Sequence, residues 1–243
     1  VDDILEQNQR KKLINFLIKW LKNKIDTILK SLIDLKNLKE KNSSIKALAY
    51  QLYENNGVLK RDQVSEYLKN LGQDERKILR DLGVKFGRYH IFLHKLIKPE
   101  AVSLRTLLWK NHHQKYFNLK PPTFGLNFLE DSKLKNRNFM LLCGFEKFEK
   151  FFVRIDILER LFILILNSNK NNEIKLIPEM LNLLGSNKEN FIKLLQNMGY
   201  KTYEKDKDVY FKYISNKKIF KKKTKRNDKI DNPFGILSQL NLK

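Results

Sequence analysis

Apolar residues recur at steps of three and four along residues 3–38, and this spacing predicts one long helix with one apolar face. The apolar positions are Leu13, Phe16, Leu17, Trp20, Leu21, Ile25, Ile28, Leu32 and Leu35. The opposite face is basic and carries Arg10, Lys11, Lys12, Lys19, Lys22, Lys24 and Lys30. We interpret this basic face as the solvated side of a packing helix, with contact to a membrane surface or to an acidic partner as the alternative.

Shorter helical patterns follow, separated by turns rich in Asn, Ser and Gly. In the first half they predict helices over residues 44–55, 61–70, 73–82 and 99–113. Residues 84–93 differ, because they are aromatic, branched and interrupted by Gly87, and they predict a strand or a tight hairpin.

The second half shows the order helix, strand, helix, helix, hairpin, which is the order of a winged helix. The helices are predicted over 154–166, 178–184 and 187–198. The extended segments are predicted over 173–176, 200–203 and 209–213.

The two halves align at two glycine-containing positions. Leu71-Gly72 matches Leu184-Gly185, and Leu82-Gly83-Val84-Lys85 matches Met198-Gly199-Tyr200-Lys201. Glycine suits the position after a helix, where a positive φ ends the helix at little cost. We therefore predict a mainly α fold, a helical bundle that includes two winged-helix-like modules with small hairpins. Chance similarity between helical hairpins is the competing explanation.

The chain divides into four segments by composition. Residues 1–119 form a domain with the long helix and the first module, and 120–136 form a linker that begins at Lys120-Pro121-Pro122. Residues 137–214 form the second module. Residues 215–243 form a basic tail that we expect to be disordered when unbound, with a short apolar end.

Charge points to a polyanionic partner. Among 243 residues, 49 are Lys or Arg and 27 are Asp or Glu, for a net charge of +22. Codon bias towards Lys, Asn and Ile accounts for part of this charge, yet the field still attracts nucleic acid. No apolar run is long enough for a membrane span, and we expect no membrane partner. The single cysteine, Cys143, suits a reducing compartment, so we expect the cytoplasm.

The sequence lacks the common catalytic motifs. It contains no P-loop, no G-x-G-x-x-G and no G-x-S-x-G. Four histidines and one cysteine show no spacing typical of a zinc site. We therefore predict no catalytic residue, no metal ligand and no cofactor in this chain.

Basic residues provide the candidate contacts to nucleic acid. Lys188 and Lys193 lie on the outer face of the helix predicted to recognise the ligand in the second module, and Lys201 begins its wing. In the first half, Lys85, Arg88 and Lys98 alternate with the aromatic residues Phe86, Tyr89 and Phe92, which we interpret as core residues, with a stacking surface for bases as the alternative. Three consecutive lysines of the tail complete the set as a phosphate-contacting arm: Lys221, Lys222 and Lys223.

The block from Leu82-Gly83-Val84-Lys85-Phe86-Gly87-Arg88-Tyr89 to Trp109 resembles a known family. It is similar to the region after the motor core in alphaproteobacterial superfamily-two DExH-type helicases, relatives of the mitochondrial degradosome RNA helicase. Weaker similar blocks lie at 154–161, 184–185, 198–200 and 232–240. The motor domains are absent from this chain, so ATP and Mg²⁺ are expected only in a missing motor. Val1 as first residue fits a truncated or split product.

The resemblance implies a C-terminal accessory region of an ATP-dependent helicase. It would guide a strand, RNA in preference to DNA, beside motor domains supplied in cis or in trans. Lys85, Arg88, Lys98 and Arg105 would contact phosphates.

Two other hypotheses remain open. The first is a stand-alone winged-helix DNA-binding protein, a dimer with Lys188 and Lys193 in the major groove. The second is a basic scaffold for acidic proteins or a membrane surface. Under either one, Arg88 and Arg105 become buried ion-pair partners.

Overall fold

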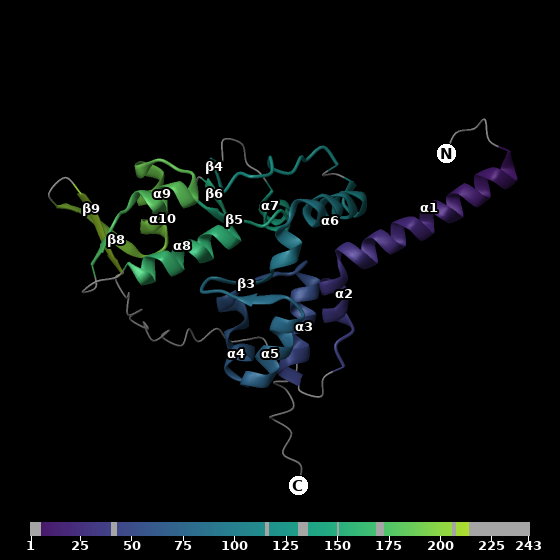
Figure 1. Cartoon of the computed structure of the whole chain (residues 1–243), viewed down its shortest axis with the longest axis horizontal. Coiled ribbons are helices and arrows are strands. Elements are labelled where there is room, and N and C mark those ends of the chain that lie inside the picture. Colours follow the sequence, from purple (N-terminus) through teal and green to yellow (C-terminus); the bar gives the residue numbers. More distant parts are fainter. Residues whose placement is uncertain are drawn as a thin grey trace, which may run out of the picture.

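The computed structural model describes residues 6–39, 43–114, 117–130, 136–149, 151–168, 173–205 and 208–213. The tail predicted to be disordered, with Lys221, Lys222 and Lys223, lies outside these residues. The fold is mostly helical with three small antiparallel sheets, as predicted in outline (Figure 1). Among the described helices, none is both long and apolar enough to pass through a lipid bilayer.

The N-terminal segment forms two helices where one was predicted. Helix α1 (Gln7–Ile28) and helix α2 (Lys30–Lys36) meet at Leu29, whose φ of −98° and ψ of 16° interrupt the helix. Helix α1 buries none of its residues, whereas Leu29, Leu32 and Leu35 are buried. The break turns α2 onto the protein body and leaves α1 projecting from it (Figure 1).

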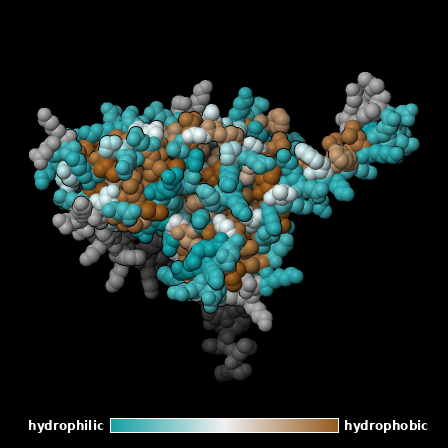
Figure 2. All heavy atoms as spheres, in the orientation of Figure 1, coloured by the Kyte–Doolittle hydropathy of each residue, from teal (hydrophilic) through white to brown (hydrophobic). Residues whose placement is uncertain are grey.

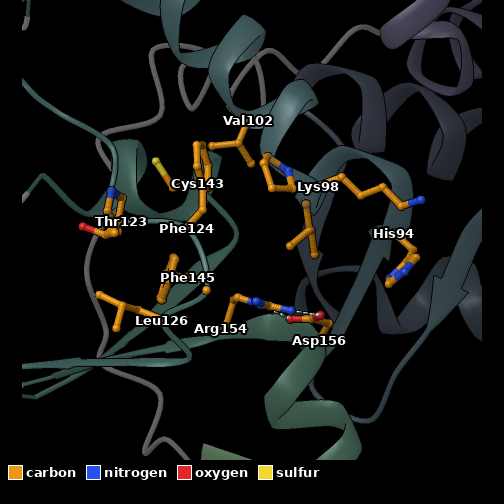
Figure 3. A pocket seen from close by; sticks show the side chains of 14 residues that line it. His94, Lys98, Val102, Thr123, Phe124, Leu126, Cys143, Phe145, Arg154 and Asp156 are labelled. Atoms are coloured by element: carbon orange, nitrogen blue, oxygen red, sulfur yellow. Dashed lines mark hydrogen bonds and ion pairs between the residues drawn. The ribbon is translucent and has the colours of Figure 1, made fainter. Parts of the chain in front are cut away.

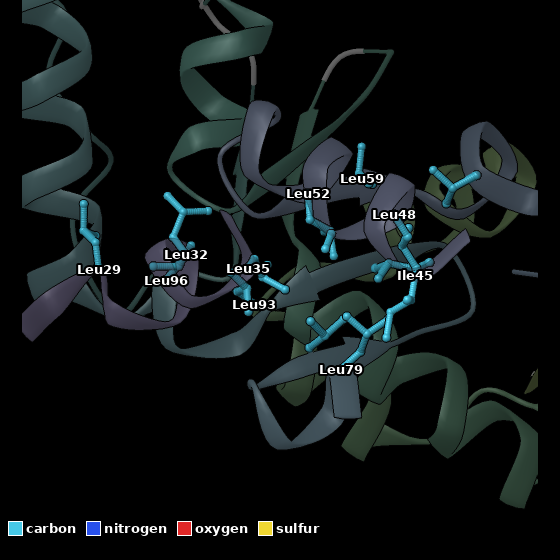
Figure 4. Packing of buried hydrophobic residues seen from close by; sticks show 14 of the residues in the cluster. Leu29, Leu32, Leu35, Ile45, Leu48, Leu52, Leu59, Leu79, Leu93 and Leu96 are labelled. Atoms are coloured by element: carbon cyan, nitrogen blue, oxygen red, sulfur yellow. The ribbon is translucent and has the colours of Figure 1, made fainter. Parts of the chain in front are cut away.

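Unit 1 comprises residues 43–93. Its elements are α3 (Ser43–Glu54), β1 (Val58–Lys60), the 3₁₀ turn Arg61–Val64, α4 (Ser65–Lys69), α5 (Gln73–Asp81), β2 (Val84–Phe86) and β3 (His90–Leu93). The antiparallel sheet has the order β1-β3-β2. Leucines and isoleucines from α2, α3, α5 and β3 pack together in its core, as Figure 4 shows.

Unit 2 comprises residues 99–154 and was not predicted as a separate unit from the sequence. Its elements are α6 (Pro99–His112), β4 (Phe128–Glu130), α7 (Arg137–Leu142), β5 (Phe145–Phe148) and β6 (Phe151–Arg154), with the sheet order β4-β6-β5. Strand β4 lies inside the predicted linker 120–136. Phe128 and Leu129 pair there with Val153 and Phe152, so this segment contributes a strand to a sheet.

Unit 3 comprises residues 155–213. Its elements are α8 (Ile155–Asn167), β7 (Ile174–Lys175), α9 (Pro178–Leu184), α10 (Lys188–Asn197), β8 (Tyr200–Lys205) and β9 (Asp208–Tyr213). The antiparallel sheet has the order β7-β9-β8. Each element lies within a few residues of its predicted position.

The three units share one topology. In each, a helix precedes a short strand, and a later helix leads into a hairpin whose second strand occupies the middle of the sheet. The glycine before each hairpin has a positive φ: Gly83 (93°), Gly144 (86°) and Gly199 (88°). Gly72 does not follow the predicted pattern. Its φ is −71°, and it begins α5 by donating its amide to Glu75 Oε2 at 2.6 Å.

The units join without spacers. Strand β3 runs through the 3₁₀ turn His94–Ile97 into α6, and β6 continues directly into α8. Val58 and Phe92 of unit 1 pack against Ile155 at the start of unit 3, with Leu141 of unit 2 beside them. The units therefore share buried side chains where they meet.

Gly144 and Gly125 give a matched test of this packing. Both have a positive φ, but a Cβ on Gly144 would lie 2.9 Å from Ile97 Cγ2, whereas no described atom lies within 4 Å of one on Gly125. We expect Gly125→Ala to lower the free energy of unfolding by about 1 kcal/mol through backbone strain alone. Gly144→Ala adds overpacking and is expected to cost about 1–3 kcal/mol more. Urea unfolding measures both, and equal losses would contradict the packing argument.

Candidate nucleic-acid interface

Three hollows surround Arg88, in the loop between β2 and β3. One of about 660 Å³ lies between this loop and α8, and two more of about 420 and 630 Å³ are also lined by Arg88. A fourth of about 180 Å³ shares His94 and Asp156 with the first. Figure 3 looks into this fourth hollow, where Lys98 lies beside His94. We call the four together the Arg88 groove, since they follow one another across all three units.

Cationic and aromatic side chains line the Arg88 groove. The cations outside the Arg154–Asp156 ion pair are Lys60, Arg61, Lys85, Arg88, Lys98, Arg160 and Lys212. The tyrosines and phenylalanines include Phe86, Tyr89, Phe124, Phe148, Phe162, Tyr200 and Tyr213. Cations that neutralise phosphates next to rings on which bases stack are the combination that binds single-stranded nucleic acid.

Most groove carboxylates are engaged by the protein itself. Arg154 donates two hydrogen bonds of 2.7 Å to Asp156. Glu146 accepts from His90 at 2.9 Å and pairs with Lys60 at 3.1 Å. Glu159 accepts backbone amides, so these three charges are compensated where they lie.

The loop that carries Arg88 is held by Glu159 of α8. Its carboxylate accepts hydrogen bonds from the consecutive backbone amides of Arg88, Tyr89 and His90, the last two at 2.8 and 2.9 Å. A Cβ on Gly87 would collide with that carboxylate, so the close approach requires glycine. Arg61 fixes the other side by donating to the Gly87 carbonyl at 2.6 Å.

This anchoring directs two side chains towards one ring. The Arg88 guanidinium lies 5.8 Å from the centroid of the Phe162 ring, and Tyr89 meets the same ring edge-on at 5.7 Å. Arg88 itself is exposed. Burial raises the pKa of Tyr89, which therefore stays neutral and can stack or donate a hydrogen bond. The loop thus presents one cation and one ring in a fixed arrangement.

His90 joins the loop to unit 2. Its buried ring donates from Nε2 to Glu146, and its Nδ1 lies 3.8 Å from Glu159. Burial alone would lower the pKa of His90, but the two carboxylates outweigh burial and raise it. Burial alone would raise the pKa of Glu146, but His90 and Lys60 lower it to about 2. We therefore expect a protonated His90 between two carboxylates.

The His90–Glu146 pair makes stability depend on pH. Because the pKa of His90 is raised, its contribution is complete below its ordinary value of 6.5 and is lost as pH rises through the raised pKa. Because the pKa of Glu146 is lowered from 4.5, its contribution is complete above that value and is lost as pH falls towards 2. The free energy of unfolding should therefore be highest near pH 5–6. Urea unfolding from pH 5 to 9 measures this, and a slope above pH 6 that survives His90→Gln would assign it to another group.

The structure brings three of the predicted contact residues together. Lys85, Arg88 and Lys98 all line the Arg88 groove. Lys188, Lys193 and Lys201 are exposed but line none of its four hollows.

The predicted recognition face of α10 is partly engaged with other described residues. Lys188 pairs with Glu204 at 3.4 Å, and Asn190 donates to Glu130 at 2.9 Å. These contacts tie α10 to β8 and to unit 2. Lys193 is the other basic residue of that face, and the structure gives its side chain no such pairing with a described residue.

Arg105 was expected to contact phosphate, and its position contradicts this. Only 3% of it is exposed. Its guanidinium donates to the carbonyls of Asn56 at 2.5 Å, Leu96 at 2.7 Å and Leu142 at 2.8 Å. Burial lowers its pKa to about 10, so it stays charged at neutral pH. Arg105 joins units 1 and 2 through these carbonyls, and among the described residues it has no ion-pair partner of the kind that the alternative hypotheses required.

Arg61 and Arg160 also line the groove, and neither was predicted from the sequence. Arg61 directly follows strand β1, which was not predicted. The residues after β1 were predicted as a helix. Arg160 lies on α8, whose residues Ile163 and Leu166 are exposed at 57% and 53%. Apolar residues on most sides of α8 were the available signal. A helix of this kind contacts other parts of the protein, or a partner, with more than one of its faces.

No protein-family model matches the chain, and neither a curated protein nor a solved structure matches it.

Proposed function

We propose that the chain binds one strand of nucleic acid, RNA in preference to DNA, along the Arg88 groove. The observation that carries this proposal is the row of connected hollows lined by seven cations and by aromatic rings. The groove crosses all three units, which suits an extended strand better than a compact small molecule.

Arg88 is the centre of the proposed contact. It is exposed, it lines three of the four hollows, and its loop is fixed by Glu159 and Arg61. A side chain held in place before binding loses less entropy when the strand arrives. Lys85 and Arg160 line the same hollow and would neutralise neighbouring phosphates, while Phe162 and Tyr89 would stack on bases.

We further propose that the units are winged-helix-like modules, three in number. The support is their shared order of elements and their shared sheet order, in which the last strand lies centrally. In this interpretation α5, α7 and α10 occupy the place of the recognition helix. The strand would nevertheless be bound between units, and not by one such helix in a major groove.

The wider role rests on the resemblance to DExH-type helicases. We propose an accessory region that guides a strand while motor domains, in cis or in trans, hydrolyse ATP. Strand binding by this chain would then require neither ATP nor Mg²⁺ and would persist in EDTA.

A titration with three probes of equal length tests the proposal. Fluorescence anisotropy would follow single-stranded RNA, single-stranded DNA and duplex DNA at several salt concentrations, with EDTA present. We expect tightest binding of single strands and a steep salt dependence. A full-length variant with Lys221, Lys222 and Lys223 changed to alanine should keep most of the affinity. Loss of binding in that variant would place the contact in the tail, and preference for duplex DNA would favour the stand-alone DNA-binding protein.

A further inference from the structure

Helix α1 carries the largest run of exposed apolar side chains on a single described element. Leu13, Ile14, Phe16, Leu17, Ile18, Trp20 and Leu21 are all classed as exposed, Phe16 at 63% and Trp20 at 51%. The helix projects from the body in Figure 1, and Figure 2 shows apolar atoms between hydrophilic ones along it. Contiguous exposed apolar side chains of this size mark interaction sites on proteins.

The apolar residues form a broad arc bordered by lysines. With 3.6 residues per turn, the seven side chains span about 200° of the helix circumference. Lys11 and Lys22 follow Ile18 at one border of the arc, and Lys12 and Lys19 face the other border beyond Phe16. A partner that buries the arc therefore meets positive charge on both sides.

The body of the protein leaves this arc uncovered by described residues. The C-terminal end of α1 is attached through Ile25 and Ile28, which pack on the core of unit 1, and through Lys24, which lies 3.7 Å from Glu100. Residues 13–21 lie beyond this attachment, and none lines the Arg88 groove. The surface is separate from the proposed strand-binding site.

The charge pattern distinguishes between possible occupants. A nucleic acid would meet the lysines and leave the apolar arc in water. A second copy of α1 would bring lysines against lysines at both borders. A lipid surface would bury Arg10 and Lys24, which lie on the central line of the arc at heptad spacing with Leu13, Leu17 and Trp20. A protein groove that covers residues 13–21 leaves both of these charges at its two ends.

We propose that α1 docks into an apolar groove on a partner protein whose rims are acidic. Large apolar side chains at helical spacing fill such a groove, and the bordering lysines pair with carboxylates on its rims. A width of about 200° fits a groove that wraps the helix, because a two-stranded coiled coil buries only a narrow seam.

Calmodulin provides a probe with this chemistry. Its calcium-loaded form opens an apolar, Met-rich groove with acidic surroundings, and chelation of calcium closes it. We would titrate the full chain against fluorescently labelled calmodulin, with calcium and with chelator. We expect binding in calcium, none in chelator, and a blue shift of Trp20 emission in the complex.

Two variants separate the contributions of the arc and of its borders. Phe16→Ser with Trp20→Ser removes apolar contacts, and Lys12→Glu with Lys19→Glu reverses charge at one border. Each is expected to weaken binding at least tenfold. Lys46→Glu with Lys77→Glu makes the same charge change at exposed positions of unit 1 and should have little effect. Because α1 buries no residue, and Lys46 and Lys77 are exposed, thermal melting should be unchanged in all three variants.

Other outcomes would overturn the proposal. They are failure of the unchanged chain to bind calmodulin in calcium, tighter binding to vesicles of three parts phosphatidylcholine to one part phosphatidylglycerol, and a dimer in sedimentation that the Phe16→Ser, Trp20→Ser variant abolishes. RNA affinity of that variant is measured in parallel. If it is unchanged, failure at α1 leaves the strand-binding proposal standing.

Discussion

Arg105→Met is expected to lower the free energy of unfolding by about 3–5 kcal/mol, since three buried carbonyls lose their hydrogen-bond donor at a cost of about 1–3 kcal/mol each. The guanidinium donates to Asn56, Leu96 and Leu142, which lie on three separate segments. Methionine fills much of the same volume but donates nothing, so three buried acceptors lose their partner. Arg105→Lys keeps the charge but not the planar fork and should lie between the two.

Leu107→Ala on the same helix is the matched control. Leu107 is exposed, so its loss should change the free energy of unfolding by less than about 0.5 kcal/mol. Urea unfolding followed by circular dichroism measures all three variants. If Arg105→Met were as stable as Leu107→Ala, the three hydrogen bonds would contribute nothing net, and phosphate contact would need to be reconsidered for Arg105.

Arg88→Ala is expected to weaken binding of single-stranded RNA about tenfold at physiological salt, through loss of one phosphate contact and of cation–π stacking. The slope of the logarithm of affinity against the logarithm of salt should fall by about 0.7. Changing Arg160 to alanine as well should bring the loss to about 100-fold, because it removes a second phosphate contact from the same hollow.

Lys193→Ala removes one positive charge from α10 and is the control for Arg88. It is also exposed but lies outside the groove hollows, so we expect less than a twofold change in affinity. The reverse result, with Lys193 sensitive and Arg88 not, would favour recognition by α10 and the stand-alone DNA-binding hypothesis.

Local signals predicted unit 3 well. Pro178 and Gly185 bound α9, and Gly199 precedes β8, where alternating residues form the hairpin. These features are local, since proline, glycine and short-range periodicity act within a few residues. The same kind of signal predicted a strand or a tight hairpin at the segment that contains Lys85 and Arg88, and the structure has a hairpin there.

Unit 2 was missed as a unit because the elements after its predicted first helix, α6, are short: β4, α7, β5 and β6 have three to six residues each. Strand β4 has three residues and follows Pro121-Pro122, which is typical of a linker. Cys143-Gly144-Phe145 repeats the helix–glycine–strand junction of Gly83 and Gly199, and this was the signal that would have found it.

Contacts between units could not be predicted from one sequence. Nothing near Arg105 in the chain indicates that Asn56 and Leu142 supply its acceptors, which lie 49 and 37 residues away. Likewise Glu159 reaches the Arg88 loop across 70 residues. Such pairings depend on how the units pack, and packing is a property of the whole fold.

The direct passage from β6 into α8 has a thermodynamic consequence. Strand β6 forms the middle of one sheet, and the next residue, Ile155, is buried between units 1 and 2. Unfolding of the first turn of α8 would disrupt strand β6, which precedes it directly. Loss of strand β6 would in turn expose Ile155. Heat should therefore unfold the three units in a single cooperative transition. Scanning calorimetry would record one endotherm, whereas three independently folding domains would give three.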